Sequence, residues 1–318
     1  MKSVFLIIAI TATAAALFFA MNSGVSTDVE TQFQDFLANY RVGYGSTDEY
    51  SFRLSVFAAN LKIIDELRIT NPEATFAVNK FADKTPEEMA VRRGVRIPEH
   101  KLARDIVHTA PTAGKSVDFT KMWSAVKDQG QCGSCWAFSA TAAFESRLQI
   151  ATGKVTDLYA EQELVDCEPQ SSGCNGGLMD FAFEYLETHG FCAEAQYKYT
   201  ARDGSCAYAK NGCAAGPVDV TYVDVAPGNE DQLLSLLEDG PVAIAVDANA
   251  WSFYSGGVFS NCGTSLDHGV TLVASNFEDG WVRVRNSWGG SWGESGHIRL
   301  KMGSNTCGYA NSASVPSF

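Results

Sequence analysis

The chain of 318 residues lacks several features that would direct its interpretation elsewhere. It has no Asn-x-Ser/Thr sequon, which excludes sorting through an N-linked glycan. It has no basic stripe, and its formal net charge of −13 argues against a nucleic acid as partner. Internal repeats and low-complexity tracts are also absent. With 46% hydrophobic and 19% charged residues, the composition is that of an ordinary globular protein.

Long apolar runs are absent apart from one near the N-terminus. Lys2 precedes an apolar stretch over residues 4–21, in which Ala14, Ala16 and Ala20 offer possible cleavage positions. This pattern predicts a signal peptide over residues 1–20 and entry into the secretory pathway, with a lysosome, a vacuole or the exterior as destination. An uncleaved anchor is the alternative, because about 18 apolar residues approach a spanning length. We expect no stable membrane association.

The nine cysteines are an odd number. A secreted chain with one cysteine left over often carries a free reactive thiol. If Cys135 is that thiol, the other eight can pair in disulfides, which the secretory pathway permits. Spacing alone cannot choose among the possible connectivities.

Cys135 lies within the sequence Gln-Gly-Gln-Cys-Gly-Ser-Cys-Trp-Ala-Phe-Ser, residues 129–139. From Ser134 onward the residues are small, aromatic or helix-forming, and no proline precedes Gly153, which predicts a helix. The unpaired N–H groups and the macrodipole at a helix N-terminus favour a negative charge. A cysteine at that position has a lowered pKa and reacts as a thiolate, so Cys135 is a candidate nucleophile.

The spacing Cys132-x-x-Cys135 also occurs in thioredoxin-like dithiols and in zinc sites. A thioredoxin-like motif needs a preceding strand in a small cytosolic domain, which the predicted signal peptide and the many later cysteines oppose. A zinc site needs a second ligand pair at matching spacing. Cys167 and Cys174 do not supply one, and no histidine lies near. We expect neither a metal nor a cofactor.

The sequence around Cys135 resembles the signature of the papain family of cysteine proteases, and the chain after its N-terminal stretch resembles a cathepsin L-like zymogen. His268 follows Cys135 by 268 − 135 = 133 residues and Asn286 by 286 − 135 = 151, which matches the family's histidine and asparagine. The resemblance implies a thiolate–imidazolium pair of Cys135 and His268, with Asn286 orienting the ring. It makes Gln129 an oxyanion donor, and Trp288 a shield over the His–Asn bond.

The resemblance also implies a substrate cleft. Trp292 would line the leaving-group side, and Gly176 and Gly177 would let a peptide backbone approach the wall. The pocket for the second residue before the scissile bond would comprise Leu178, Met179, Ala248, Leu266 and Ser312. Four of these are apolar and one is small, so we expect Leu, Phe or Val there and weak tolerance of Arg. No insertion resembles the occluding loop of cathepsin B-like exopeptidases, which favours an endopeptidase.

Three disulfides are implied by the same resemblance: Cys132–Cys174, Cys167–Cys206 and Cys262–Cys307. Cys192 and Cys213 are extra relative to the common three-bridge pattern, and we expect them to pair with each other.

Residues 21–112 resemble an inhibitory propeptide. Apolar residues at spacings of three and four predict helices between Asp28 and Arg68. The cathepsin L-like prodomain pattern is present as Glu49, Arg53, Phe57, Asn60 and Ile64, then Asn79, Phe81 and Asp83, with departures at Arg68 and Ala77. A basic linker over about Val91–Lys115 is expected to run through the cleft in reverse and to be cut. A purely solvated linker is the alternative.

Residues 113–318 are expected to form the peptidase domain, of α+β class. The patterns predict helices over residues 134–151, 160–167 and 178–189, and strands over 218–225, 242–246, 270–273, 281–285 and 297–300. Helices followed by strands indicate a papain-like fold with a helical left lobe and a β-barrel-like right lobe.

We therefore predict a monomeric cysteine endopeptidase that is made as an inactive precursor. Its partners would be protein and peptide substrates, with its own propeptide as an intramolecular inhibitor. The alternative is a catalytically silent homologue that acts as a binding or inhibitory protein.

Overall fold

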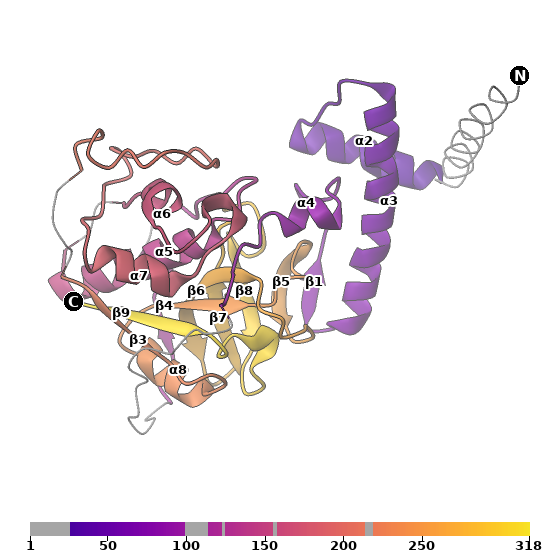
Figure 1. The fold of residues 1–318 in the computed structure, drawn as a ribbon. Coiled ribbons are helices and arrows are strands. Elements are labelled where there is room, and N and C mark those ends of the chain that lie inside the picture. Colours follow the sequence, from indigo (N-terminus) through magenta and orange to yellow (C-terminus); the bar gives the residue numbers. More distant parts are fainter. Residues whose placement is uncertain (1–25, 99–113, 123–124, 155–157, 214–218) are drawn as a thin grey trace, which may run out of the picture.

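The computed structural model describes residues 26–98, 114–122, 125–154, 158–213 and 219–318 (Figure 1). The expected signal peptide, its cleavage site and the expected start of the peptidase domain at residue 113 lie outside the described residues. Within the described ranges, no helix combines the length and the apolar character that crossing a bilayer requires.

The described part of the chain begins with a pair of helices, α2 (Thr27–Tyr40) and α3 (Thr47–Thr70), which stand to one side of the body (Figure 1). Arg41 ends α2 in the left-handed conformation, and the Ser46 side chain caps α3 by accepting a hydrogen bond from the N–H of Glu49. Apolar rings at helical spacing fill the space between the helices, and Phe33 packs on Phe57 with ring centroids 5.2 Å apart. The helical prodomain is confirmed.

Two short elements connect this arm to the body. Strand β1 (Ala74–Phe76) pairs antiparallel with a strand of the body, and α4 (Pro86–Ala90) lies between arm and body (Figure 1). Thr85 and Glu88 form a reciprocal capping box at the start of α4. Neither element was predicted, because runs this short carry no periodicity.

Three helices cover one side of the sheet: α5 (Cys135–Thr152), α6 (Glu161–Cys167) and α7 (Met179–Leu186) (Figure 1). They agree with the predicted helices, except that α7 ends before the predicted residue 189. Every residue of α5 from Cys135 to Ser146 is buried, as its apolar composition requires. A further helix, α8 (Glu230–Leu237), was missed, and so were three short 3₁₀ turns (Thr120–Met122, Gly173–Asn175 and Thr306–Gly308).

The described strands follow the order β1-β5-β8-β7-β6-β4-β9-β3, with β2 paired to β6. Their bounds are β2 Val117–Asp118, β3 Thr221–Asp224, β4 Val242–Val246, β5 Tyr254–Phe259, β6 His268–Asn276, β7 Trp281–Arg285, β8 His297–Lys301 and β9 Ala313–Ser317. Strands β4 and β7 have their predicted bounds. Strand β6 is longer than predicted and has His268 as its first residue. Three of these strands were missed: β2 has only two residues, β5 contains two glycines and β9 contains Pro316, and both glycine and proline disfavour strands.

The buried apolar residues form two large clusters, one centred on helices α5 to α7 and one that joins the sheet to α8 and to the prodomain helices. Helix α5 packs on β6 at the boundary of the two clusters, where the Ser139 hydroxyl donates to the Val270 carbonyl oxygen at 2.6 Å. The α+β, two-lobed architecture is thereby confirmed, and the predicted active-site residues lie along this boundary.

Candidate active site

Cys135 is the first residue of α5, and its side chain is fully buried. It is the one free cysteine among the described residues. The N–H of Gly94, from the propeptide, donates to Sγ at 3.1 Å. The backbone N–H of Gly269, the residue after His268, is also directed at the sulfur. Residues far apart in the sequence therefore converge on this thiol.

The remaining cysteines are joined in four disulfides: Cys132–Cys174, Cys167–Cys206, Cys192–Cys213 and Cys262–Cys307. The resemblance had implied three of these pairs, and the pairing of the two extra cysteines is also present. The Cys132–Cys174 bridge ties the loop before α5 to the cleft wall, where the N–H of Gly133 donates to the carbonyl oxygen of Cys174 at 2.8 Å.

His268 and Asn286 are joined by a bond of 2.7 Å between Nε2 and the amide oxygen Oδ1. The backbone N–H of Ser287 donates to the same Oδ1, also at 2.7 Å, so the oxygen of the amide faces the ring. The ring therefore carries its hydrogen on Nε2. Its Nδ1 is buried and has no hydrogen-bond partner among the described residues. Trp288 is fully buried against the ring, with centroids 4.9 Å apart, and keeps water from the His–Asn bond.

Gln129 is fully buried in the loop before α5. Its amide oxygen accepts from the Ser287 hydroxyl at 2.6 Å, which turns Nε2 toward the cleft. Nε2 donates to the carbonyl oxygens of Cys132 and of Arg92, a propeptide residue, both at 2.8 Å. A donor beside the thiol that already holds a peptide carbonyl has the arrangement of an oxyanion site.

The propeptide crosses the cleft as an extended segment. Val95 forms a parallel bridge with Gly177. The N–H of Gly177 donates to the Gly94 carbonyl oxygen at 2.8 Å, and the N–H of Arg96 donates to that of Gly177 at 3.0 Å. The propeptide backbone also lies close to Gly176, because a Cβ at that residue would stand 2.5 Å from the Gly94 carbonyl oxygen. The prediction that the wall glycines allow close backbone approach thus agrees with the contacts of this segment.

Three of the five expected pocket residues belong to the same apolar cluster as the buried Val95 side chain: Leu178, Met179 and Leu266. Ala248 belongs to the neighbouring sheet cluster, and Ser312 is buried with its carbonyl oxygen accepting from Ala245 N. On the other side of the thiol, the buried indole of Trp292 packs edge-on against Trp288, with centroids 5.1 Å apart.

Burial under the propeptide shifts the pKa values of the central pair in opposite directions. It raises the pKa of the Cys135 thiol to about 11, although the N–H groups of Gly269 and Gly94 oppose the shift. It lowers the pKa of His268 to about 3, against the opposing effect of the bond to Asn286. Both shifts favour the neutral forms. The expected thiolate–imidazolium pair therefore belongs to the open cleft and stays a prediction.

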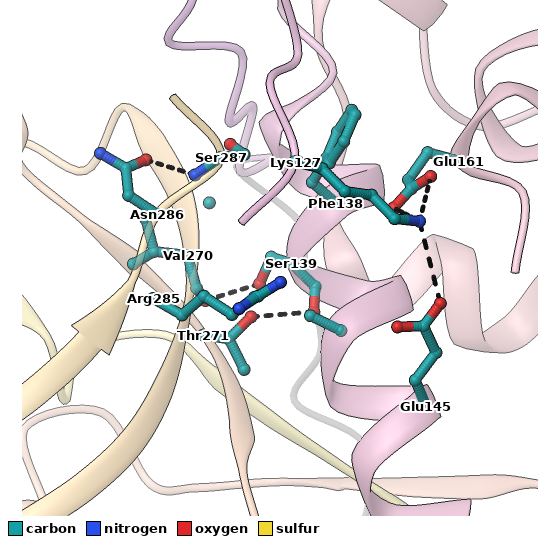
Figure 2. Close-up of a pocket in the computed structure, with 12 residues that line it drawn as sticks. Lys127, Phe138, Ser139, Glu145, Glu161, Val270, Thr271, Arg285, Asn286 and Ser287 are labelled. Atoms are coloured by element: carbon teal, nitrogen blue, oxygen red, sulfur yellow. Dashed lines mark hydrogen bonds and ion pairs between the residues drawn. The ribbon is translucent and has the colours of Figure 1, made fainter. Parts of the chain in front are cut away.

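A cluster of buried charges anchors the loop that carries Gln129 (Figure 2). The Lys127 ammonium bonds Glu161 of α6 at 2.8 Å and lies 3.9 Å from Glu145 of α5. Figure 2 shows these groups facing Arg285 and its neighbours on the sheet side of the boundary. Burial raises the pKa of Glu145 to about 7, with Lys127 opposing. Since the loop leaves this cluster two residues before Gln129, the cluster fixes the position of that amide.

Sequence reasoning missed three residues that act on the site. Ser287 orients Gln129, and it lay within the Asn-Ser-Trp-Gly run already noted. Asp128 and Asp267 form ion pairs with the propeptide. Each aspartate directly precedes a predicted catalytic residue in the sequence, and this position could have indicated that it lies near the active site.

A free thiol at a helix N-terminus, an imidazole bonded to an amide and a buried amide that donates to a peptide carbonyl form the arrangement of a thiol-dependent acyl-transfer hydrolase. Residues 113–317 match the Papain family cysteine protease pattern, and residues 33–89 match the Cathepsin propeptide inhibitor domain (I29). The chain belongs to the papain family of cysteine proteases and carries the propeptide of a zymogen.

Curated relatives and solved structures match the chain over most of its length. The chain is 37% identical to Cathepsin L 2 of Paramecium tetraurelia over 313 residues, which covers 95% of this chain and 98% of the relative. It is 40% identical to vignain of Ricinus communis over 295 residues, covering 85% and 81% respectively. Among solved structures, digestive procathepsin L 3 of the Tenebrio molitor larval midgut superposes with a TM-score of 0.80 at 34% identity, over 92% of this chain and 100% of that one.

Proposed function

We propose that Cys135 is the nucleophile of this protease, His268 its proton carrier, Asn286 the group that orients the imidazole and Gln129 the oxyanion donor. One observation carries the assignment. Gln129 Nε2 donates to the carbonyl oxygen of Arg92 in the propeptide, and two residues further on the N–H of Gly94 donates to the Cys135 sulfur. A peptide bond thus occupies the position that a reacting carbonyl would need. A catalytically silent homologue would not require this arrangement of groups.

Active-site titration tests the assignment. After propeptide removal, an irreversible thiol-directed epoxide should label one mole of Cys135 per mole of protein, and peptidase activity should fall in proportion. The Cys135→Ala variant should be unlabelled and inactive. Stoichiometric labelling without any peptidase activity in the unlabelled protein would favour the silent homologue.

The substrate preference follows from the pocket around Val95. We infer that Leu178, Met179, Ala248, Leu266 and Ser312 accept Leu, Phe or Val at the second position before the scissile bond. The burial of Val95 among three of them supports this, because an apolar pocket gains by apolar burial and has no carboxylate for Arg. A fluorogenic Phe-Arg substrate should be cleaved much faster than its Arg-Arg counterpart. Equal rates would contradict the assignment.

We further propose that residues 1–20 are a signal peptide, that residues 21–112 are removed on maturation, and that the enzyme works as a monomer in a lysosome, a vacuole or the extracellular space. The I29 match and the secretory use of disulfides support this. Timed acidification of the precursor, followed by N-terminal sequencing and size-exclusion of the product, tests the cleavage point and the oligomeric state. A new N-terminus far from residue 113 would overturn the boundary.

A further inference from the structure

Two carboxylates of the peptidase domain hold basic residues of the propeptide. The Asp267 side chain binds the Arg93 guanidinium at 2.8 Å. The Asp128 side chain lies 2.5 Å from the Lys80 ammonium and 3.3 Å from the Arg92 guanidinium. Both arginines are largely buried by these contacts, with side chains 8% and 10% exposed.

These carboxylates lie next to the reacting groups. Asp128 directly precedes Gln129, and Asp267 directly precedes His268. Asp128 also forms a bridge with Trp288, which places it on the wall of the leaving-group side. Neither carboxylate belongs to the expected catalytic set or to the expected pocket for the second residue before the scissile bond.

The propeptide residues give the order of positions along the cleft. Val95 is buried in the apolar cluster that contains Leu178 and Met179, and the N–H of Gly94 donates to the thiol sulfur. Arg93 and Arg92 continue beyond the thiol, and the carbonyl of Arg92 reaches Gln129. Their side chains therefore occupy the space that the first residues after the scissile bond of a substrate would enter.

When the propeptide leaves, Asp128 and Asp267 lose their cations and face the empty cleft. We propose that these two carboxylates select substrates with Arg or Lys at the first and second positions after the scissile bond. The inference rests on the proposed function, since it presupposes that hydrolysis occurs at Cys135. It adds a charge preference on the leaving-group side to the apolar preference on the other side. The net charge of −13 also attracts basic peptides, so the test must separate the effect of these two carboxylates from that of the overall charge.

The test uses the mature enzyme and internally quenched peptides with Leu fixed two residues before the scissile bond. The first and second residues after that bond are varied singly among Arg, Gln and Glu. An ion pair of this exposure predicts kcat/KM about threefold higher for Arg than for Gln at each position, with Glu lowest. The preference should shrink in 0.5 M salt, because salt screens exposed charges.

Three variants separate the local carboxylates from the overall charge. Asp128→Asn and Asp267→Asn keep the size and an acceptor oxygen, and each should reduce the Arg-to-Gln ratio toward one. Glu278→Gln removes the same formal charge from an exposed turn after β6, at the opposite end of that strand from His268. That variant should keep the wild-type ratio. Epoxide titration of Cys135 gives the active fraction of every preparation, so a poorly folded variant is not mistaken for an altered one.

The outcomes are distinct. Cleavage of none of the peptides by the wild-type enzyme would refute the proposed function. Cleavage of Arg, Gln and Glu peptides at equal rates would refute only the charge preference. A preference that persists in both aspartate variants, or that Glu278→Gln lowers equally, would assign it to the overall charge and overturn the inference.

Discussion

Replacing Gly94 by alanine should release the propeptide from the cleft. A Cβ at this position would stand 1.8 Å from the carbonyl oxygen of Gly133, with the carbonyl carbon and Cα of Gly133 at 2.5 and 2.8 Å. All three are backbone atoms, and Gly133 is itself held by the carbonyl of Cys174. Bringing the closest contact to 3.0 Å requires a shift of at least 3.0 − 1.8 = 1.2 Å, so the propeptide segment must lift.

The magnitude follows from the bonds that such a shift breaks. The segment would lose the Gly94 N–H bond to the Cys135 sulfur, the Gly177 N–H bond to the Gly94 oxygen and the Gln129 bond to the Arg92 oxygen. At about 1 kcal/mol each, the loss is about 3 kcal/mol, which corresponds to a roughly 100-fold weaker inhibition constant. The apolar contacts of the prodomain arm are untouched, so residual inhibition should remain.

The assay is inhibition of the mature enzyme by the isolated propeptide added in trans. Gly45→Ala is the matched control, because a Cβ there meets nothing within 4 Å. That variant should inhibit like the wild-type propeptide. Circular dichroism of the free propeptides separates loss of binding from loss of helix. If Gly94→Ala inhibits as well as Gly45→Ala, the cleft contacts do not hold the propeptide as described.

Three further predictions concern the catalytic groups and the extra disulfide. Gln129→Ala should lower kcat about 10²–10³-fold while epoxide labelling of Cys135 persists, and an unchanged kcat would exclude an oxyanion role. Burial in the precursor lowers the pKa of His268 from 6.5 to about 3. In a Cys135→Ala enzyme no thiolate can pair with the ring, so the contribution of the neutral ring to propeptide binding is present above pH 6.5 and is lost as the pH falls toward 3. The dissociation constant of the propeptide from that variant should therefore rise on acidification through this window, and a flat profile would contradict the burial argument. Replacing Cys192 and Cys213 by serine opens a loop with a sequence separation of 21 and should lower the free energy of unfolding in urea by about 3 kcal/mol, with kcat/KM preserved; no change in unfolding would show that the bridge does not stabilise the fold.

The sequence was most informative where a residue's role depends on its type and spacing. Cys135, His268 and Asn286 were chosen by motif and separation, and the structure brings them to one boundary between α5 and β6. The long helix α5 and the alternating strand β7 carry strong periodicity, and their predicted bounds are close to those observed. Strand β1 has only three residues and helix α4 only five, which is little more than one helical turn, so neither shows a period in the sequence and both depend on tertiary contacts.

The charge pairing in the cleft could not be predicted from the sequence in the same way. The basic linker suggested contact with an acidic body, but not which carboxylates would receive Arg92 and Arg93. Those contacts depend on where the segment crosses the cleft. Backbone hydrogen bonds between Gly94 and Gly177 determine where the segment lies in the cleft. Backbone hydrogen bonds depend little on residue type, so the sequence does not reveal them.

We expect the protonation state of Cys135 and His268 to differ between the two forms of the protein, for a physical reason. In an open cleft, the helix N-terminus and a nearby imidazolium lower the pKa of a thiol. In the precursor, the propeptide removes water from both groups, and loss of solvation outweighs those effects. The propeptide therefore inhibits in two ways, because it fills the substrate position and it favours the unreactive neutral forms of Cys135 and His268. Cleavage of the linker alone would relieve neither effect while the segment stays bound, so activation requires dissociation of the propeptide.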